Sequence, residues 1–160
     1  MTYRLRRSAR VLLFNPAGEI LLIRFAAELD GAPFIFWVTP GGEVEPGEPD
    51  LDAAQRELQE ELGLSLPLFG PVHEESGGTY THLGETVRNF DVLFAAVCER
   101  SAPSLSGVTA DEIRLMQEAR WWIITELAST TERVFPKGSA EIAGRVWRAL
   151  HHRNFEATGG

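Results

Sequence analysis

The chain has 160 residues, of which 44% are hydrophobic and 24% charged, and its formal net charge is −8 at pH 7. This length suffices for one sizeable core and is too short for two ordinary domains, so we expect one domain over residues 1–156 and a frayed terminus at residues 157–160. The negative charge would repel a nucleic-acid polymer, and no apolar run approaches the length of a membrane span, so we expect neither nucleic acid nor a membrane as partner. Small anionic ligands stay open if a metal ion or a local cluster of basic residues offsets the charge.

The start of the chain and its single cysteine indicate the compartment. The apolar stretch Val11–Phe14 follows basic residues but is too short for a signal-peptide core, so we expect a cytoplasmic protein. Cys98 is the only cysteine, which excludes intramolecular disulfides and multi-thiolate metal sites. Because Cys98 ends the apolar run that begins at Val92, we expect it to be buried in the core. A homodimer is left open by the sequence.

The first elements are strands. Aliphatic residues at Arg10–Phe14 and Ile20–Ile23, separated by the turn-forming segment Asn15–Gly18, predict a β-hairpin. Phe34–Val38 is a third predicted strand, and it must stop or turn at the Pro-Gly-Gly sequence of residues 40–42.

A helix is predicted next, over Pro49–Leu62. The segment contains no glycine and no internal proline, proline suits the first helical position, and Gly63 supplies a C-terminal cap. The helix is amphipathic, with a packing stripe formed by Leu51, Ala54, Leu58 and Leu62.

The remaining chain mixes strands and helices. Strands are predicted at Pro71–Glu75, Gly78–His82, Val87–Val97 and Arg120–Ile124. A loop is predicted at Pro103–Gly107, a short helix at Asp111–Glu118, and a closing helix at Ala140–His152 with Ile142, Val146, Trp147 and Leu150 on its inner side. Together with the hairpin, this order predicts a mixed sheet packed between helices, in the α/β (α+β) class.

Three glutamates share one face of the helix predicted at Pro49–Leu62. Glu57, Glu60 and Glu61 stand at positions i, i+3 and i+4. Like charges at i, i+4 cost roughly 0.2–0.5 kcal/mol, and a bound cation would reverse that sign. Hard divalent cations take oxygen ligands, and the glycines at positions 41 and 42 allow the main chain to approach an ion or a phosphate. A solvated acidic face, with Arg56 and Glu60 as a surface ion pair, is the alternative.

A longer pattern surrounds these glutamates. Gly42 is followed by five residues and Glu48, then by seven residues and Arg56-Glu57-Leu58-x-Glu60-Glu61-x-Gly63-Leu64. The pattern resembles the Nudix box at every specified position, and Arg120-Trp121-Trp122 with Glu126-Leu127 resembles a weaker downstream signature. The resemblance implies the Nudix fold and a Mg²⁺-dependent hydrolase, with Mn²⁺ able to substitute. The implied reaction cleaves a nucleoside diphosphate linked to another group, as in a nucleoside triphosphate, a dinucleoside polyphosphate or a nucleotide sugar.

The resemblance also implies a role for each residue of the box. Glu57 and Glu61 would be the principal metal ligands, with Glu60 and the Gly42 carbonyl as additions. Arg56 would pair with Glu48 and orient the carboxylates. The general base stays open: Glu57 or Glu60 within the box, or Glu85, Glu112 or Glu118 outside it.

The substrate is less defined than the reaction. Tyr80 resembles a tyrosine of dinucleoside polyphosphate hydrolases, and Thr79 stands where ADP-ribose hydrolases often have proline. The candidates for sandwiching a base are Phe36, Trp37 and Trp121, and the candidates for touching phosphate are Arg24, His82 and Arg88. Ordinary packing or surface placement is the alternative for each. A catalytically silent Nudix-fold nucleotide sensor is the second hypothesis, and an acidic scaffold is the third.

Overall fold

One mixed β-sheet carries the fold, and the computed structural model describes it over residues 2–29, 31–82, 84–99 and 116–158. Within these ranges eight strands are hydrogen-bonded in the order β5-β6-β1-β2-β3-β8, with β4 paired to β1 and β7 paired to β2. The strands are β1 Arg4–Phe14, β2 Ile20–Leu29, β3 Ala32–Val38, β4 Gly41–Glu43, β5 Phe69–His82, β6 Glu85–Val97, β7 Met116–Trp122 and β8 Val134–Phe135. The β1–β6 and β3–β8 pairs are parallel and the other pairs antiparallel.

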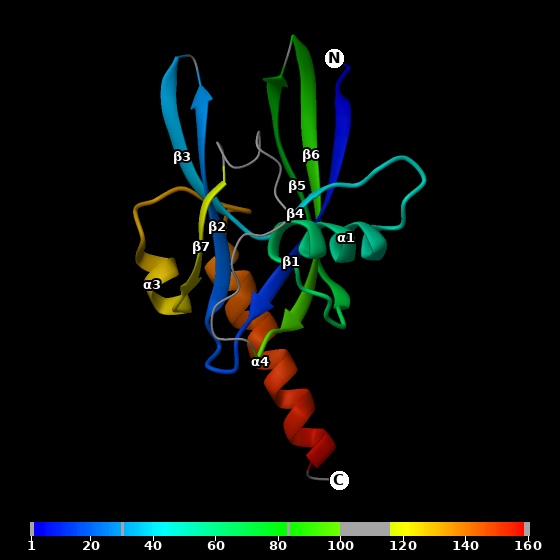
Figure 1. Cartoon of the computed structure of the whole chain (residues 1–160), viewed down its shortest axis with the longest axis vertical. Helices are drawn as coiled ribbons and strands as arrows, with labels where there is room; N and C mark the ends of the chain where they lie inside the picture. The colour runs from blue at the N-terminus through cyan, green and yellow to red at the C-terminus, as the bar shows by residue number, and fades with distance from the viewer. Residues whose placement is uncertain (1, 30, 83, 100–115, 159–160) are drawn as a thin grey trace.

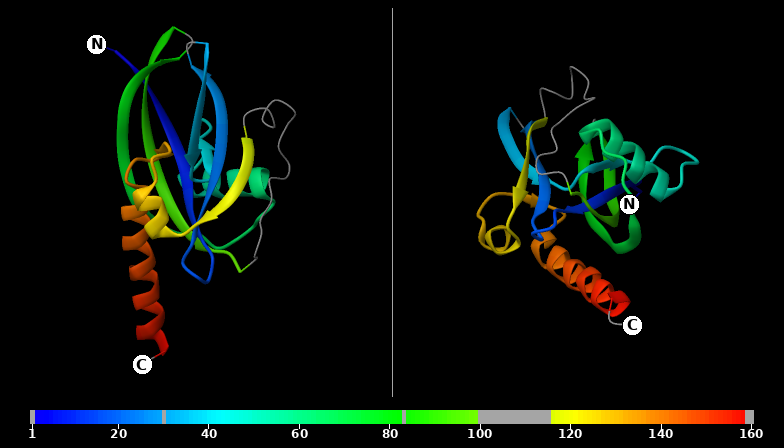
Figure 2. Two further views of the ribbon diagram at one scale, coloured as in Figure 1. Left: turned by 90° about the vertical axis from the view of Figure 1, so that its left-hand side faces the viewer. Right: turned by 60° about the horizontal axis from the view of Figure 1, so that its bottom comes forward.

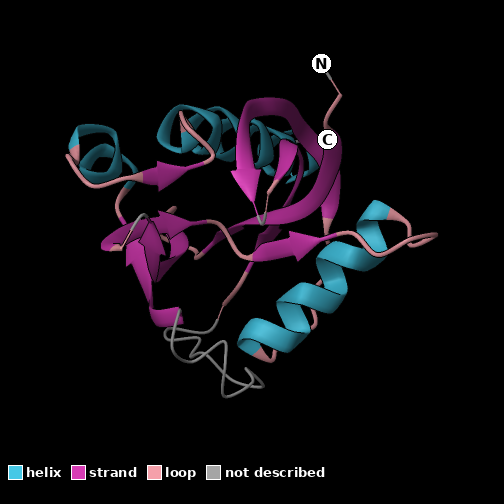
Figure 3. Cartoon of the chain, turned by 90° about the horizontal axis from the view of Figure 1, so that it is seen from above, coloured by secondary structure: helices cyan, strands magenta, loops and turns pink. Residues whose placement is uncertain are grey.

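Helices cover both faces of this sheet (Figure 3). They are α1 Asp50–Leu62, α3 Ile124–Ser129 and α4 Ser139–Thr158. Because side chains of a strand alternate between faces, β1 contributes to two buried clusters. Val11 and Leu13 pack in the cluster that includes α1, while Leu12 and Phe14 pack in the cluster that includes α3 and α4. The predicted mixed sheet between helices is confirmed.

The sheet is curled rather than flat. Strands β2 and β3 splay away from β1, β5 and β6 toward the end at which the chain begins (Figure 1), and the curl is visible from the side (Figure 2). The far end of α4 runs beyond the sheet in both views. Within the described ranges, no helix combines the length and hydrophobicity needed to cross a bilayer.

Most elements of the first half agree with the sequence-based prediction. The hairpin is confirmed by the antiparallel pair Phe14↔Ile20, although both strands are longer than predicted. Gly63 caps α1 in the left-handed region with φ 64°, as predicted. Pro49 is the N-cap residue, with extended backbone, so the helix begins one residue later than predicted. The prediction that Leu51 belongs to the packing stripe is wrong, because Leu51 is 39% exposed. Ala53 is buried in the stripe instead.

Several predicted boundaries in the second half are wrong. One strand, β5, replaces the two predicted strands, because the glycine signals mark register shifts inside a continuous strand. Residues 116–118 belong to β7 rather than to the predicted helix at Asp111–Glu118. The rest of that helix and the predicted loop at Pro103–Gly107 lie outside the described residues. Strand β7 ends at Trp122, and Ile124 starts the unpredicted helix α3.

The closing helix α4 is confirmed and is longer than predicted. It extends to Thr158, so residues 157 and 158, expected beyond the last element, belong to it, while residues 159 and 160 lie outside the described ranges. Its predicted inner side is confirmed, since Ile142, Val146, Trp147 and Leu150 all pack in the cluster on that face. Cys98 is 1% exposed and is a core residue, as expected.

Candidate active site

The turn between β3 and α1 is pressed against β1. Strand β4 pairs with β1 so that Gly41 lies opposite Arg10 and Gly42 opposite Ala9. Gly41 has φ 145°, and a Cβ there would overlap the carbonyl oxygen of Ala9 and lie 2.7 Å from the Arg10 Cα. Only glycine therefore fits at position 41.

The other side of the same turn faces α1. A Cβ on Gly42 would lie 2.5 Å from Oε1 of Glu57 and 2.9 Å from its Oε2. The small size of Gly42 thus lets the main chain approach the Glu57 carboxylate. Next to it, the Gly41 backbone N–H donates a 2.8 Å hydrogen bond to Oε1 of Glu61, which is only 7% exposed. The loop and the helix are therefore in direct contact at these two glutamates.

Arg56 connects the carboxylates of this site. Its guanidinium donates two hydrogen bonds to Glu48, from Nε at 2.9 Å and from Nη2 at 3.0 Å. Nη1 donates to Oε1 of Glu57 at 3.0 Å and to Oε2 of Glu60 at 3.3 Å, and Nη2 also donates to the Glu43 carbonyl at 3.2 Å. One arginine therefore fixes three carboxylates and the loop backbone relative to one another.

The pKa values of Glu57 and Glu48, the two carboxylates that Arg56 contacts most closely, shift in opposite directions. Burial raises the pKa of Glu57 above its usual value, although Arg56 partly opposes this shift. The hydrogen bonds from Arg56 lower the pKa of Glu48, and they raise the pKa of Arg56 in turn. Partial burial thus disfavours the charged form of Glu57, whose side chain is 17% exposed, and a nearby cation would favour it.

The three helix glutamates share a helix face but have different partners. The Glu57 carboxylate packs against Gly42, and Glu61 accepts a hydrogen bond from the Gly41 N–H. Glu60 is about half exposed and forms an ion pair with Arg56. Within the described ranges, no three Asp, Glu, His or Cys side chains are gathered as metal ligands. The donors have the hard-oxygen chemistry that Mg²⁺ or Mn²⁺ requires, and the main chain at Gly42 approaches Glu57 without a side chain between them. In this respect the chemistry of Glu57, Glu61 and Gly42 suits a divalent cation, whereas Glu60 is paired with Arg56.

Two of the residues expected to contact substrate, Trp37 and Tyr80, have hydrogen-bond partners outside this cluster. Trp37 is 2% exposed, donates from Nε1 to Glu132 at 3.2 Å and packs edge-on against Trp122. Tyr80 is 38% exposed and donates to Oδ1 of Asn89 at 3.2 Å. Arg24 lies opposite Trp37 in the β2–β3 pair.

The other candidates are divided between core and surface. Phe36 stacks on Phe25, Trp121 packs against the cluster that includes α1, and Arg88 lies over the Tyr3 ring. The side chain of His82 lies outside the described part of the chain. Among the alternative bases, Glu85 pairs with Arg4 at 3.3 Å, Glu118 is exposed on β7, and Glu112 lies outside the described residues.

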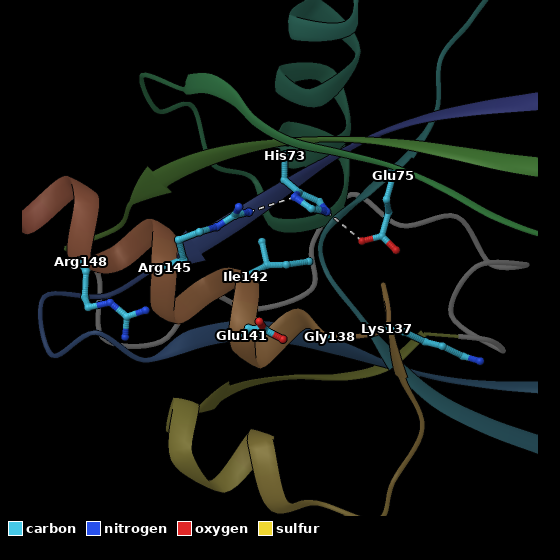
Figure 4. Close-up of a pocket in the computed structure, with 8 residues that line it drawn as sticks. All are labelled: His73, Glu75, Lys137, Gly138, Glu141, Ile142, Arg145 and Arg148. Carbon is cyan, nitrogen blue, oxygen red and sulfur yellow. Dashed lines mark hydrogen bonds and ion pairs between the residues drawn. The ribbon is translucent and has the colours of Figure 1, made fainter.

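A cavity that the sequence did not predict lies between β5 and α4 (Figure 4). Its volume is about 380 Å³, and its polar lining includes His73, Glu75, Glu141 and Arg145. Arg145 donates to Nδ1 of His73 at 3.0 Å, so the imidazole carries its hydrogen on Nε2 and donates it to Glu75, also at 3.0 Å. Arg145 is 72 positions from His73 along the chain, so the sequence shows no motif that joins them. None of the predicted site residues lines this cavity.

Comparison with known proteins gives matches of two kinds. A family model described as the NUDIX domain matches residues 4–148. The chain is 47% identical over 57 residues to the Bos taurus m7GpppN-mRNA hydrolase NUDT17, covering 36% of this chain and 18% of that protein. It is 40% identical over 65 residues to the RNA pyrophosphohydrolase of Erythrobacter litoralis, covering 41% and 38%. The matched segments thus span less than two fifths of these relatives.

Solved structures match over nearly the whole chain. The MutT protein of Methanosarcina mazei Go1 superimposes with a TM-score of 0.67 at 20% identity, covering 94% of this chain and 98% of that one. The Escherichia coli dihydroneopterin triphosphate pyrophosphohydrolase gives 0.65 at 18% identity, covering 91% and 97%. At such identities the likeness establishes the fold.

Proposed function

The chain belongs to the Nudix family, and from this premise we propose that it is a hydrolase that cleaves a phosphoanhydride bond with the help of a divalent cation. Mg²⁺ is the proposed ion, with Mn²⁺ able to substitute. The observation that carries the proposal is the contact of the turn at Gly41 and Gly42 with Glu57 and Glu61. In this contact the buried Glu61 carboxylate lies next to main chain that carries no side chains, at Gly41 and Gly42.

The proposed roles follow from the contacts of each residue. Glu57 and Glu61 hold the cation together with the Gly42 carbonyl, and Glu60 joins them. A divalent cation in such a site neutralises phosphate oxygens and favours attack by water. Arg56 and Glu48 orient Glu57, a role that the two-point ion pair and the Arg56–Glu57 contact support. Glu57 or Glu60 is the proposed general base, with Glu85, Glu112 and Glu118 as alternatives.

The proposed substrates are small nucleotides: a nucleoside triphosphate, a dinucleoside polyphosphate or a nucleotide sugar. A likeness to a Caenorhabditis elegans Ap4A hydrolase, with a TM-score of 0.60, is compatible with the second of these. Two relatives are named for hydrolysis at mRNA caps or on RNA, and the net charge of −8 argues against a long RNA partner here. Tyr80 and Arg24 remain the proposed substrate contacts, and Tyr80 is the more exposed of the two. Trp37, which is 2% exposed and packs in the core, fits the packing alternative instead.

The proposal is tested with purified protein and a panel of nucleoside triphosphates, dinucleoside polyphosphates, nucleotide sugars and capped and triphosphorylated RNA. Release of phosphate, pyrophosphate or nucleoside monophosphate is followed with Mg²⁺, with Mn²⁺ and with chelator. We expect turnover on a small nucleotide that chelator abolishes and that Glu57→Gln lowers by more than about 100-fold, since even supporting residues of metal sites contribute 10–100-fold. Absence of turnover on every substrate would contradict the enzyme hypothesis.

A nucleotide sensor without catalysis is the second candidate. The same panel separates the two candidates when binding is measured alongside turnover. Saturable nucleotide binding without product would support the sensor, whereas product formation would exclude it.

A further inference from the structure

Arg10 is a largely buried cation that contacts the glycine turn from the side of β1. Its side chain is 13% exposed and that of its partner Asp91 is 15% exposed. Nε of Arg10 donates to Oδ1 of Asp91 at 3.3 Å, and Nη1 donates to the carbonyl of Thr39 at 3.0 Å. The guanidinium therefore bridges β6 and the residue that precedes the Pro-Gly-Gly turn.

The backbone at Arg10 contacts the same turn. Arg10 lies opposite Gly41 in the β1–β4 pair, and the next N–H, of Val11, donates to the Pro40 carbonyl at 2.8 Å. A Cβ on Gly41 would lie 2.8 Å from Cγ of Arg10. Arg10 thus contacts the turn through its backbone, its aliphatic stem and its guanidinium.

The opposite side of this turn contacts the proposed metal ligands. Gly41 donates to Glu61, and Gly42 packs against the Glu57 carboxylate. A continuous series of contacts therefore runs from Arg10 through the turn to both carboxylates. A displacement of the turn would change the distance from the Gly42 main chain to Glu57 and would break the bond to Glu61.

Stability alone does not account for this polar cluster. A buried Arg–Asp pair contributes little net stability, because the attraction is offset by the loss of hydration. The hydroxyls of Ser8 and Thr39 are also buried there, and neither has a hydrogen-bond partner within the described part of the chain. Apolar residues would pack at this position at lower cost, so the cluster is better explained by a geometric role.

We propose that Arg10 is a positioning residue for the divalent-cation site, holding residues 39–42 so that the main chain at Gly42 meets Glu57 and the Gly41 N–H holds Glu61. This inference rests on the proposed function. Arginine suits the role because its planar guanidinium donates in two directions at once, here to a carboxylate and to a carbonyl. A lysine at this position would keep the positive charge, but its single ammonium group could not reproduce both hydrogen bonds.

The test compares three variants of the full chain by Mn²⁺ binding, followed by electron paramagnetic resonance, and by thermal unfolding. Arg10→Gln removes the bridge and the charge, and Arg10→Lys removes the bridge alone. Arg7→Gln is the control, because Arg7 lies on the same strand and pairs with an aspartate, but its partner Asp50 is at the start of α1 and not in the turn. The apparent Mg²⁺ requirement and kcat are measured on the same preparations.

We expect both Arg10 variants to raise the Mn²⁺ dissociation constant by about tenfold or more, and Arg7→Gln to leave it near the wild-type value while lowering the unfolding temperature. If Arg10→Gln does not fold, Arg10→Lys carries the test. Wild-type Mn²⁺ affinity in a folded Arg10 variant, or an equal loss in Arg7→Gln, would overturn the positioning role. A wild-type protein that binds no Mn²⁺ would instead contradict the proposed function on which the role depends.

Discussion

The backbone N–H of Gly41 donates to Oε1 of Glu61 across 2.8 Å, so a residue proposed as a metal ligand also anchors the turn. An N–H that is shielded from water and left without an acceptor costs up to about 1–3 kcal/mol, and the Gly41 N–H is partly shielded. Because Glu61 is 7% exposed, water does not readily replace its carboxylate. The structural and the metal-binding contributions of Glu61 therefore have to be separated by the choice of substitution.

Glu61→Gln keeps a side-chain oxygen for the Gly41 N–H but removes the charge, whereas Glu61→Ala removes both. We expect turnover to fall by orders of magnitude in both variants. Only Glu61→Ala should also lower the free energy of unfolding, by about 1–3 kcal/mol, and each kcal/mol lowers the unfolding temperature by about 2–4 °C. Turnover assays and thermal unfolding check this. Equal unfolding temperatures for the two variants would show that the hydrogen bond contributes nothing to the fold.

Gly42→Ala tests the close approach of the main chain to Glu57. The added Cβ would lie 2.5 Å from Oε1 of Glu57, so the carboxylate must move. We expect weaker Mn²⁺ binding and at least about tenfold lower turnover, as for other displaced metal ligands. Gly78→Ala is the matched control, since nothing lies within 4 Å of a Cβ there. If both variants behave alike, the approach to Glu57 has no functional role.

The sequence predicted the helical placement of the box residues well because that placement depends on local spacing. The i, i+3, i+4 spacing placed Glu57, Glu60 and Glu61 on one helix face, and Gly63 marked the helix end. Their final partners depend on Gly41 and on the reach of Arg56, which helical spacing does not specify.

Contacts between distant segments could not be read from the sequence in the same way. Arg10 and Asp91 are 81 residues apart, and Arg7 and Asp50 are 43 apart. Both pairs follow from strand pairing and helix placement, which no local pattern encodes. In β5 the local signal was misleading, because Gly77 and Gly78 permit a register shift within a strand instead of ending it.

Arg56→Lys tests whether the two-point pairing with Glu48 orients Glu57. Lysine cannot donate in parallel to both Glu48 oxygens and also reach Glu57, so we expect kcat to fall about 10–100-fold with folding retained. Glu48→Gln should cause a similar loss. Because the two residues act as one unit, the double variant should be little worse than either single variant. Multiplicative losses in kcat would show that Arg56 and Glu48 act independently.

Arg7 and Asp50 join β1 to the first turn of α1 and give stability a pH dependence. Nε and Nη2 of Arg7 donate to the two carboxylate oxygens at 2.7 and 2.6 Å, and these bonds lower the pKa of Asp50. A carboxyl group with a pKa lower in the folded than in the unfolded chain stabilises the fold above its unfolded pKa, about 3.9. That stabilisation is lost as the pH falls through the folded pKa.

Asp50→Asn should therefore lower the free energy of unfolding at pH 7 by about 1 kcal/mol, a modest value because Arg7 is 42% exposed and water screens the pair. The difference from wild type should shrink below pH 4, as protonation removes the same charge from the wild-type protein. Urea unfolding over a pH series measures both. Asp52→Asn is the control, since Asp52 shares the first turn and its helix-dipole interaction but has no ion pair within the described ranges. A pH-independent difference, or an equal loss in Asp52→Asn, would assign the effect to the helix terminus and not to Arg7.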